Sequence, residues 1–172
     1  MLRRIEGRVE MTVREVVLIG DTRLRQTAQA VDFAAHDWRQ DAMDLADTLA
    51  DLKARLGFGR GLAGPQIGSC WRLIAFDCHL GTFVAINPRI TWRSSETFSV
   101  LDDCFSIPGR KVPVMRSRSI TFEYLDFDGQ AHVFERLEPD LAELVQHEVD
   151  HLDGILMVDR ARAETLEHRA RS

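Results

Sequence analysis

The stretch QHEVDHL, residues 146–152, decides the fold of this chain. It contains the pattern His-Glu-x-x-His, and Pro139 precedes it at a position suited to a first helical turn, where the missing N–H of proline costs nothing. We therefore predict a helix from Asp140 to about residue 152. At 3.6 residues per turn, His147 and His151 lie one turn apart on one face, within reach of a single metal ion.

The apolar residues of this helix indicate which side faces the core. The side predicted to point inward carries Leu141, Leu144, Val145, Val149, Leu152, Ile155 and Leu156. The opposite side carries most of the polar residues, Glu143, Gln146, Asp150 and Asp153. Two histidines and Glu148 near the buried side are costly unless something compensates them, and a metal ion would do so. The alternative is a coincidental pattern that binds no metal.

Two histidines do not complete a catalytic metal site, which takes a third protein ligand and keeps one position for water. Candidates lie downstream at Glu164, Glu167 and His168. Another lies upstream, where Cys104 occurs in the loop-like stretch LDDCFSIPG, residues 101–109. A thiolate suits Fe(II) or Zn(II), but a cysteine is also commonly a small buried apolar residue. The residues alone leave these alternatives open.

The remainder of the chain predicts one α+β domain. Its 172 residues, 45% of them hydrophobic, are enough for one well-filled core. Apolar residues spaced three or four apart predict a helix over 37–56, followed by a glycine-rich loop. Short β-like runs occupy 13–19, 71–77, 82–86, 112–115, 119–125 and 131–135, and Asp128-Gly129 favours a hairpin turn. Helix, strands and then helix is the order of an α+β fold.

Composition excludes several classes of protein. The 22 Lys and Arg against 27 Asp and Glu give a net charge of −5, which argues against a stable nucleic-acid partner. No apolar run is long enough to span a membrane, so we expect no membrane partner. Three cysteines are an odd number and too few for a disulfide scaffold, which favours a reducing compartment and a cytoplasmic protein.

The first ten residues are treated apart from the rest. They contain basic residues but no apolar core of a signal peptide, and residues 5–8, IEGR, match a protease site that cloning can introduce. We therefore expect residues 1–10 to be an N-terminal extension and residues 11–172 to form a single metallohydrolase domain.

Three segments resemble, in order, the signature motifs of peptide deformylases. They are GRGLAGPQ at 59–66, DDCFS at 102–106 and QHEVDHL at 146–152, with supporting matches at 24–25, at 86–88 and at Gly154. The resemblance implies an α+β fold with small antiparallel sheets packed around a central helix that carries His-Glu-x-x-His. It also implies one divalent metal ion held by Cys104, His147 and His151, which would be Fe(II) in the cell and replaceable by Zn(II) or Ni(II).

The reaction implied by the resemblance is hydrolysis of an N-formyl group with release of formate. The substrate would be the N-formyl-methionyl end of nascent polypeptides, which would make the ribosome a transient partner. Glu148 would act as base and then acid, and Gln66 with the backbone N–H of Phe105 would stabilise the oxyanion. Without the other motifs, Gln66 would be interpreted as a residue capping its own loop. Substrate contacts would come from Gly59, Gly61, Leu62, Asp103, Lys111 and Leu144.

Departures from the family pattern lie mostly on the substrate side. Asp102 and Asp103 replace Glu and Gly of the second motif, and Asp103 adds bulk and negative charge beside the metal. In the first motif, Arg60 stands between two glycines where an apolar residue is common, and Gly64 replaces an alanine. Asp140 and Glu143 occupy positions near the methionine pocket that are more often apolar or basic.

These departures keep other functions open. Acidic residues in the pocket would favour a basic or polar substrate, as in a specialised deformylase for a non-methionyl or small-molecule formamide. A non-catalytic metal-binding relative is a second alternative, against which the retained Glu148 argues. A protease with a downstream third ligand would leave Gln66 and Cys104 unexplained.

Overall fold

The helix predicted over residues 37–56 forms as α1, Trp38–Leu56, in the computed structural model, which describes residues 12–35 and 37–161. The Asp37 side chain accepts a hydrogen bond from the Trp38 N–H, and Gly57, with a left-handed φ of 76°, ends the helix. The expected extension at 1–10 and the ligand candidates Glu164, Glu167 and His168 lie outside the described residues.

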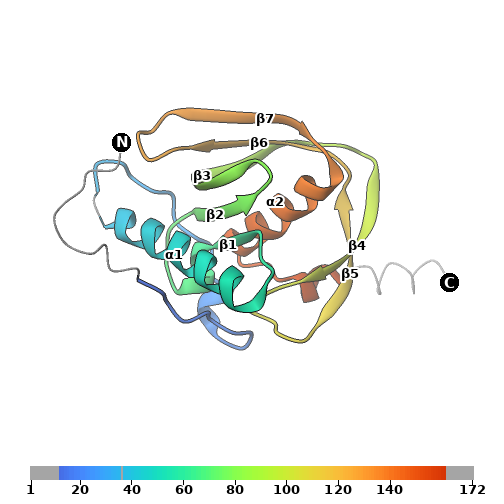
Figure 1. Cartoon of the computed structure of the whole chain (residues 1–172). Coiled ribbons are helices and arrows are strands. Elements are labelled where there is room, and N and C mark those ends of the chain that lie inside the picture. The colour runs from blue at the N-terminus through green and yellow to red at the C-terminus, as the bar shows by residue number, and fades with distance from the viewer. Residues whose placement is uncertain (1–11, 36, 162–172) are drawn as a thin grey trace.

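Two antiparallel sheets follow α1 (Figure 1). The five-stranded sheet has the order β1-β2-β3-β6-β7, formed by Gly61–Ala63, Leu73–Cys78, Gly81–Arg93, Ile120–Leu125 and Ala131–Leu137. The two-stranded sheet pairs β4, Thr97–Asp103, with β5, Lys111–Ser117. The prediction of an α+β fold with small antiparallel sheets is confirmed, as is the turn at Asp128-Gly129, where the Gly129 N–H donates to the Asp126 carbonyl.

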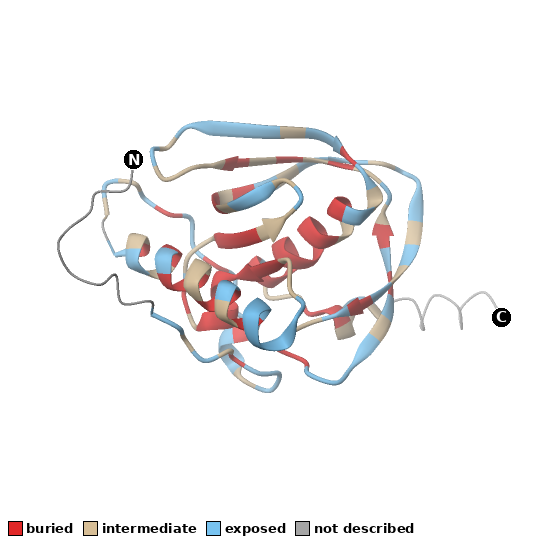
Figure 2. Cartoon of the chain, in the orientation of Figure 1, coloured by how far each residue is buried: buried red, intermediate tan, exposed pale blue. Residues whose placement is uncertain are grey.

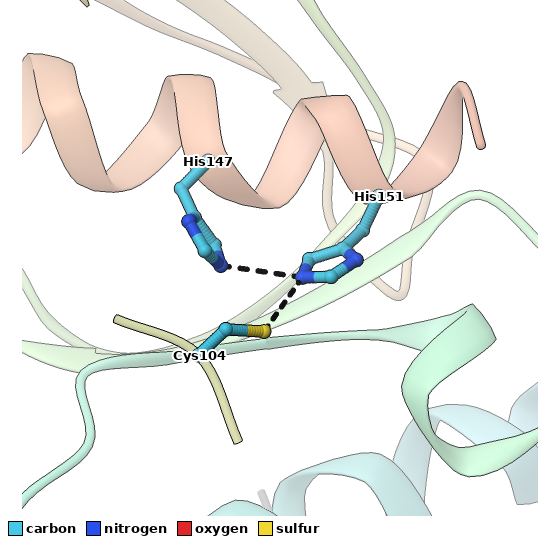
Figure 3. Close-up of side chains that lie close together, drawn as sticks. All are labelled: Cys104, His147 and His151. Atoms are coloured by element: carbon cyan, nitrogen blue, oxygen red, sulfur yellow. Dashed lines mark hydrogen bonds between the residues drawn. The ribbon is translucent and has the colours of Figure 1, made fainter. Parts of the chain in front are cut away.

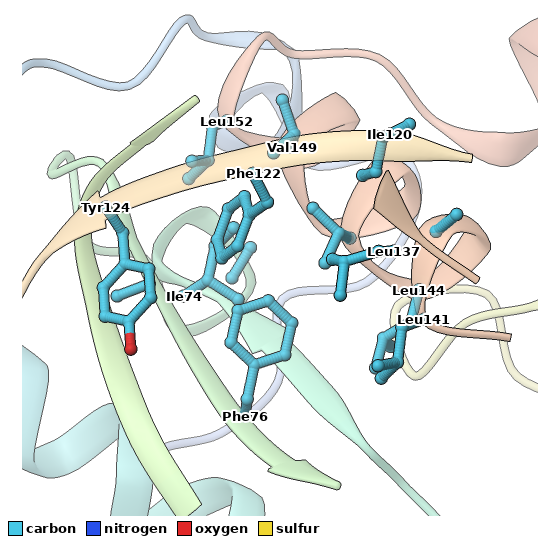
Figure 4. Packing of buried hydrophobic residues seen from close by; sticks show 14 of the residues in the cluster. Ile74, Phe76, Ile120, Phe122, Tyr124, Leu137, Leu141, Leu144, Val149 and Leu152 are labelled. Atoms are coloured by element: carbon cyan, nitrogen blue, oxygen red, sulfur yellow. The ribbon is translucent and has the colours of Figure 1, made fainter. Parts of the chain in front are cut away.

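Alternation along β2 gives the larger sheet two apolar faces. Ile74 and Phe76 pack in one cluster with residues of α2, Pro139–Leu152 (Figure 4). Leu73 and Ala75 point the other way into a second cluster with α1. The sheet therefore lies between the two helices, and β1 brings the segment after α1 against α2.

Helix α2 is buried on nearly all sides, which corrects the prediction of a polar outer face (Figure 2). It contacts β1 of the larger sheet and β5 of the smaller one. Gln146 and Asp150 are 4% and 5% exposed, because β5 covers the side on which they lie. The Gln146 amide exchanges hydrogen bonds with the backbone of Ser117, so its burial leaves its polar atoms satisfied.

The strand predicted at 13–19 is wrong, and two strands escaped prediction. Residues 13–19 run alongside the site without joining a sheet: the Val17 N–H donates to the Gln66 carbonyl and the Ile19 N–H to the Ser106 carbonyl. Strand β1 has only three residues within the glycine-rich segment. In β4 the acidic Asp102 is buried and Leu101 is exposed, so the apolar pattern of the sequence does not follow the strand. No helix within the described ranges is long and apolar enough to cross a membrane.

Candidate metal centre and cleft

Three side chains from two distant segments converge on one point (Figure 3). Cys104 follows β4 directly, and His147 and His151 project from consecutive turns of α2. The Cys104 Sγ lies 3.2 Å from the His151 Nε2, which in turn lies 3.2 Å from the His147 Nε2. All three potential ligand atoms lie within 4.8 Å of one another, and both histidines are buried. The structure thus brings the upstream candidate for the third ligand to the histidine pair.

The proton arrangement of the two rings fits a cation at this point. The His147 Nδ1 lies 2.8 Å from the Asp102 Oδ1, which favours a proton on that nitrogen and a lone pair on Nε2. Burial lowers the pKa of both rings, and that of His151 falls. Hydrogen bonds with Asp102 and Cys104 nevertheless raise the pKa of His147 overall, so a cation would have to displace a proton from its Nε2 to use that lone pair. The neutral His151 can then also direct a lone pair inward. A divalent ion would stabilise two facing lone pairs, and tetrahedral ligands about 2.0–2.1 Å from an ion lie roughly 3.4 Å apart.

Sequence reasoning missed the charged network behind His147. Asp102 is 5% exposed and accepts a hydrogen bond from the Arg116 Nη2 at 2.7 Å. The Arg116 Nη1 donates to Asp150, which also accepts from Arg160 at 2.5 Å. A signal was present in the sequence, because alternation along VPVMR, residues 112–116, places Arg116 on the same side as the apolar Val114. A buried arginine needs acidic partners, and two are supplied.

Glu148 lies beside the two histidines with a strongly perturbed carboxyl group. Burial raises its pKa to about 7, and its Oε2 is buried without a hydrogen-bond partner among the described residues. A carboxyl group with a pKa near neutrality can both accept and return a proton during one reaction cycle. Its burial, its missing partner and the nearby carboxylates of Asp102 and Glu143 destabilise the charged form, a cost characteristic of functional sites.

Gly61 leaves the space that Glu148 occupies, and we expect Gly61→Ala to displace it. A Cβ at this position would lie 2.7 Å from the Glu148 Oε1 and 2.9 Å from its Cγ. A shift of the carboxylate by about 1 Å typically costs on the order of 10²-fold in turnover. Catalytic turnover should fall by that amount while the metal content, measured by elemental analysis, stays unchanged. Turnover within about threefold of the wild type would show that the carboxylate position is not critical.

Gln66 and Phe105 lie on the Cys104 side of the centre. The Gln66 Oε1 accepts from the Ala63 N–H at 2.9 Å, and its Nε2 lies 3.2 Å from the Ser106 Oγ and 3.5 Å from the Cys104 Sγ. Gln66 therefore caps its own loop and also turns its amide donor toward the metal ligands. The Phe105 N–H has no backbone acceptor within the part of the chain that is described. Its ring stacks on Phe58 at 5.5 Å between ring centroids.

A cleft of about 1690 Å³ opens onto these groups. Gly59, Gly61, Asp103, Lys111 and Leu144, all expected to contact substrate, line it together with Gln66, His147 and Glu148. Leu62 differs, because its side chain is fully buried in the cluster under α1 and does not line the cleft. Any contact of Leu62 with a substrate would have to come from its backbone.

The charged residues that the sequence places around the cleft form ion pairs with one another. Asp103 and Lys111 face each other across β4 and β5, with the Lys111 Nζ 3.5 Å from the Asp103 Oδ2. Arg60 binds both Asp140, at 2.7 Å, and Glu143. Asp140 is largely exposed, whereas the Glu143 side chain is 13% exposed and lines the cleft. Of the two acidic residues that bind Arg60, only Asp140 therefore turns toward solvent.

Comparisons with known proteins agree along almost the whole chain. A family model described as polypeptide deformylase matches residues 13–167. The peptide deformylase of Dictyoglomus thermophilum is 39% identical over 154 residues, which cover 90% of this chain and 96% of that relative. The solved structure of a peptide deformylase from Synechococcus elongatus in complex with actinonin gives a TM-score of 0.78 at 31% identity, covering 94% of this chain and 85% of that one. The Met-Ala-Ser-bound class I type b peptide deformylase of Acinetobacter baumannii gives 0.77 at 28% identity, covering 88% and 99%.

Proposed function

The chain belongs to the polypeptide deformylase family, and we propose that Cys104, His147 and His151 form the metal centre of its active site. Members of this family are metal-dependent hydrolases that remove N-formyl groups from nascent peptides, and the chain is such an enzyme. The observation that carries the assignment of the site is the convergence of three ligand atoms, within 4.8 Å of one another, beside a buried glutamate at the cleft.

The proposed ion is Fe(II) in the cell, with Zn(II) or Ni(II) as substitutes. One thiolate and two imidazoles are a donor set that binds each of these ions. When bound, the ion would lower the pKa of a water molecule to near neutrality and polarise the formyl oxygen. Asp102 would orient the His147 ring from behind, because its Oδ1 lies 2.8 Å from the Nδ1 that faces away from the ion.

The chain's own residues supply proton transfer and charge stabilisation. In this proposal Glu148 takes a proton from the attacking water and returns it to the amine that leaves, for which a pKa of about 7 is well suited. The amide N–H of Gln66 and the backbone N–H of Phe105 would donate to the oxyanion that develops on the formyl group. Gly61 keeps space open for the Glu148 carboxylate.

The proposed substrate is a formylated peptide that lies along the cleft. The two solved relatives support it, since one is described in complex with actinonin and the other bound to Met-Ala-Ser. The cleft has room for residues that follow the formylated one, and Gly59, Asp103 and Lys111 would line their path. We also propose that the enzyme acts in the cytoplasm, in transient contact with the ribosome. The central position of α2 in a single domain spanning 11–172 is part of the same proposal.

Formate release from formyl-Met-Ala-Ser tests this function directly. The protein is stripped of metal with a chelator and then reloaded anaerobically with Fe(II), or with Ni(II) in air. We expect formate from the reloaded protein and none from the stripped protein. Protein that binds one equivalent of metal yet releases no formate would contradict the proposal and favour a non-catalytic relative.

A further inference from the structure

A cluster of three charged residues lies at the cleft next to the proposed metal centre, and two of them, Arg60 and Glu143, line it. Arg60 precedes β1, and its guanidinium reaches the first turns of α2. Its Nη1 donates to the Asp140 Oδ1 at 2.7 Å, and its Nη2 donates to the Glu143 Oε1. We call Arg60, Asp140 and Glu143 the ionic wall.

The ionic wall lies close to the reacting groups on both segments that carry it. Glu143 lies four residues before His147 on α2, and residues four apart on a helix are neighbours on one face. Arg60 directly precedes Gly61, whose Cα faces the Glu148 carboxylate. Arg60 and Glu143 both line the cleft, as do Leu144 and Glu148. A substrate side chain next to the formyl group therefore meets charged atoms as well as Leu144.

The charges of the ionic wall do not cancel. One guanidinium opposes two carboxylates, which leaves one net negative charge, and the His79 ring, 3.8 Å from the Asp140 Oδ2, adds no permanent charge. Among the described residues, no hydrogen bond uses the second oxygen of Glu143. An apolar side chain placed there would remove water from charged groups without replacing their hydrogen bonds. A side chain with N–H donors could bond to the spare carboxylate oxygen instead.

From this arrangement we infer that the ionic wall weakens selection for a methionyl side chain and favours formylated substrates whose first side chain donates hydrogen bonds. This inference rests on the proposed function of the same cleft. It names a substrate class, formyl peptides that begin with a polar or basic residue. Recognition would act through the Glu143 carboxylate, which lines the cleft, while Arg60, itself bound by Asp140, would hold that carboxylate in place.

Two matched pairs of peptides measure this preference. Formyl-Met-Ala-Ser is compared with formyl-Gln-Ala-Ser, whose first side chain is similar in length, and formyl-norleucyl-Ala-Ser with formyl-Lys-Ala-Ser, which differ by the ammonium group. For the wild type we expect kcat/KM ratios, apolar over polar, of about one or below. In the variant Arg60→Ile, Asp140→Leu, Glu143→Ile, both ratios should rise by about fivefold or more, because the wall becomes apolar.

A surface ion pair provides the matched control. Arg89 and Glu123 pair at 2.6 Å on β3 and β6 and do not line the cleft. The variant Arg89→Ile, Glu123→Leu removes a comparable ion pair and should leave both ratios unchanged. Should the triple variant fail to fold, Glu143→Gln serves instead, since it keeps the size of the side chain; it should lower the preference for lysine over norleucine by about threefold.

The outcomes separate this inference from the proposed function. Dissociation constants of Met-Ala-Ser and Gln-Ala-Ser, measured by calorimetry on the metal-loaded proteins, provide the same comparison without turnover. If the two kcat/KM ratios rose by less than about fivefold in the triple variant while formate was still released, the inference would be overturned and the proposed function would stand. Absence of formate from all four peptides with metal bound would overturn the function, and the product dissociation constants would still decide whether the ionic wall selects side chains.

Discussion

Replacing Glu148 with glutamine should nearly abolish formate release while the metal stays bound. Glutamine has the same size but cannot take a proton from water, and general base catalysis contributes on the order of 10²–10⁴-fold to turnover. The Glu148 carboxylate is not among the three ligand atoms that converge, so the metal centre itself should remain intact. The measurement is kcat from formate release together with metal content by elemental analysis.

The control for this prediction is Glu135→Gln on the exposed side of β7. It makes the same chemical change far from the cleft and should leave kcat unchanged. If Glu148→Gln retained more than about a tenth of the wild-type kcat, another group would have to move the proton, and the role proposed for Glu148 would be wrong.

Replacing Cys104 with serine should remove most of the bound metal. A serine hydroxyl does not ionise near neutral pH and is a poor ligand for Fe(II), Ni(II) or Zn(II) compared with a thiolate. Changes that only affect partners of metal ligands cost about 10–100-fold in affinity, so we expect the loss of a direct ligand to cost more. The measurement is metal affinity by competition with a chelator. Loading with Co(II) adds an independent readout, because thiolate–cobalt charge transfer should disappear from the absorption spectrum.

Cys70→Ser and Cys78→Ser are the matched controls. Neither thiol is among the converging ligand atoms, so both variants should bind metal like the wild type. If Cys104→Ser kept its full metal affinity and its activity, the thiolate would not be a ligand. The downstream residues Glu164, Glu167 and His168 would then be the next candidates to replace.

The long helices and most strands could be predicted because their signals are local. Asp37 and Gly57 mark the ends of α1, and Pro139 marks the start of α2. Strand β1 could not be predicted, since three residues are too few for a periodic pattern and its place is set by pairing with β2. The strand predicted at residues 13–19 is wrong for the opposite reason, because a local signal is present but misleads. Their composition suits a strand, but their backbone bonds to the Gln66 and Ser106 carbonyls instead of a sheet edge.

The part of the site on α2 could be predicted, because the spacing of its motif fixes where the side chains lie. The spacing of His147 and His151 places both rings on one helical face, and the structure turns both toward one point. The placement of Cys104 depends on how the β4–β5 sheet packs against α2 through β5, which only the resemblance to a family could anticipate. The buried partners Asp102 and Arg116 were missed because an acidic residue in a strand is usually exposed. Alternation along β5 indicates only that Arg116 is buried, and which acidic residues pair with it is a property of tertiary packing.

The network around Arg116 also constrains how this sequence can change over generations. Arg116 is held between the buried Asp102 and Asp150, and its removal would leave Asp102 with His147 alone and Asp150 with the partly exposed Arg160 alone as charged partner. Breaking a buried ion pair from one side typically costs about 3–5 kcal/mol, a large fraction of the stability of a domain. A mutation at one of these three positions is therefore tolerated only when another follows, so we expect the three to be inherited as a unit and to vary together among descendants of this chain.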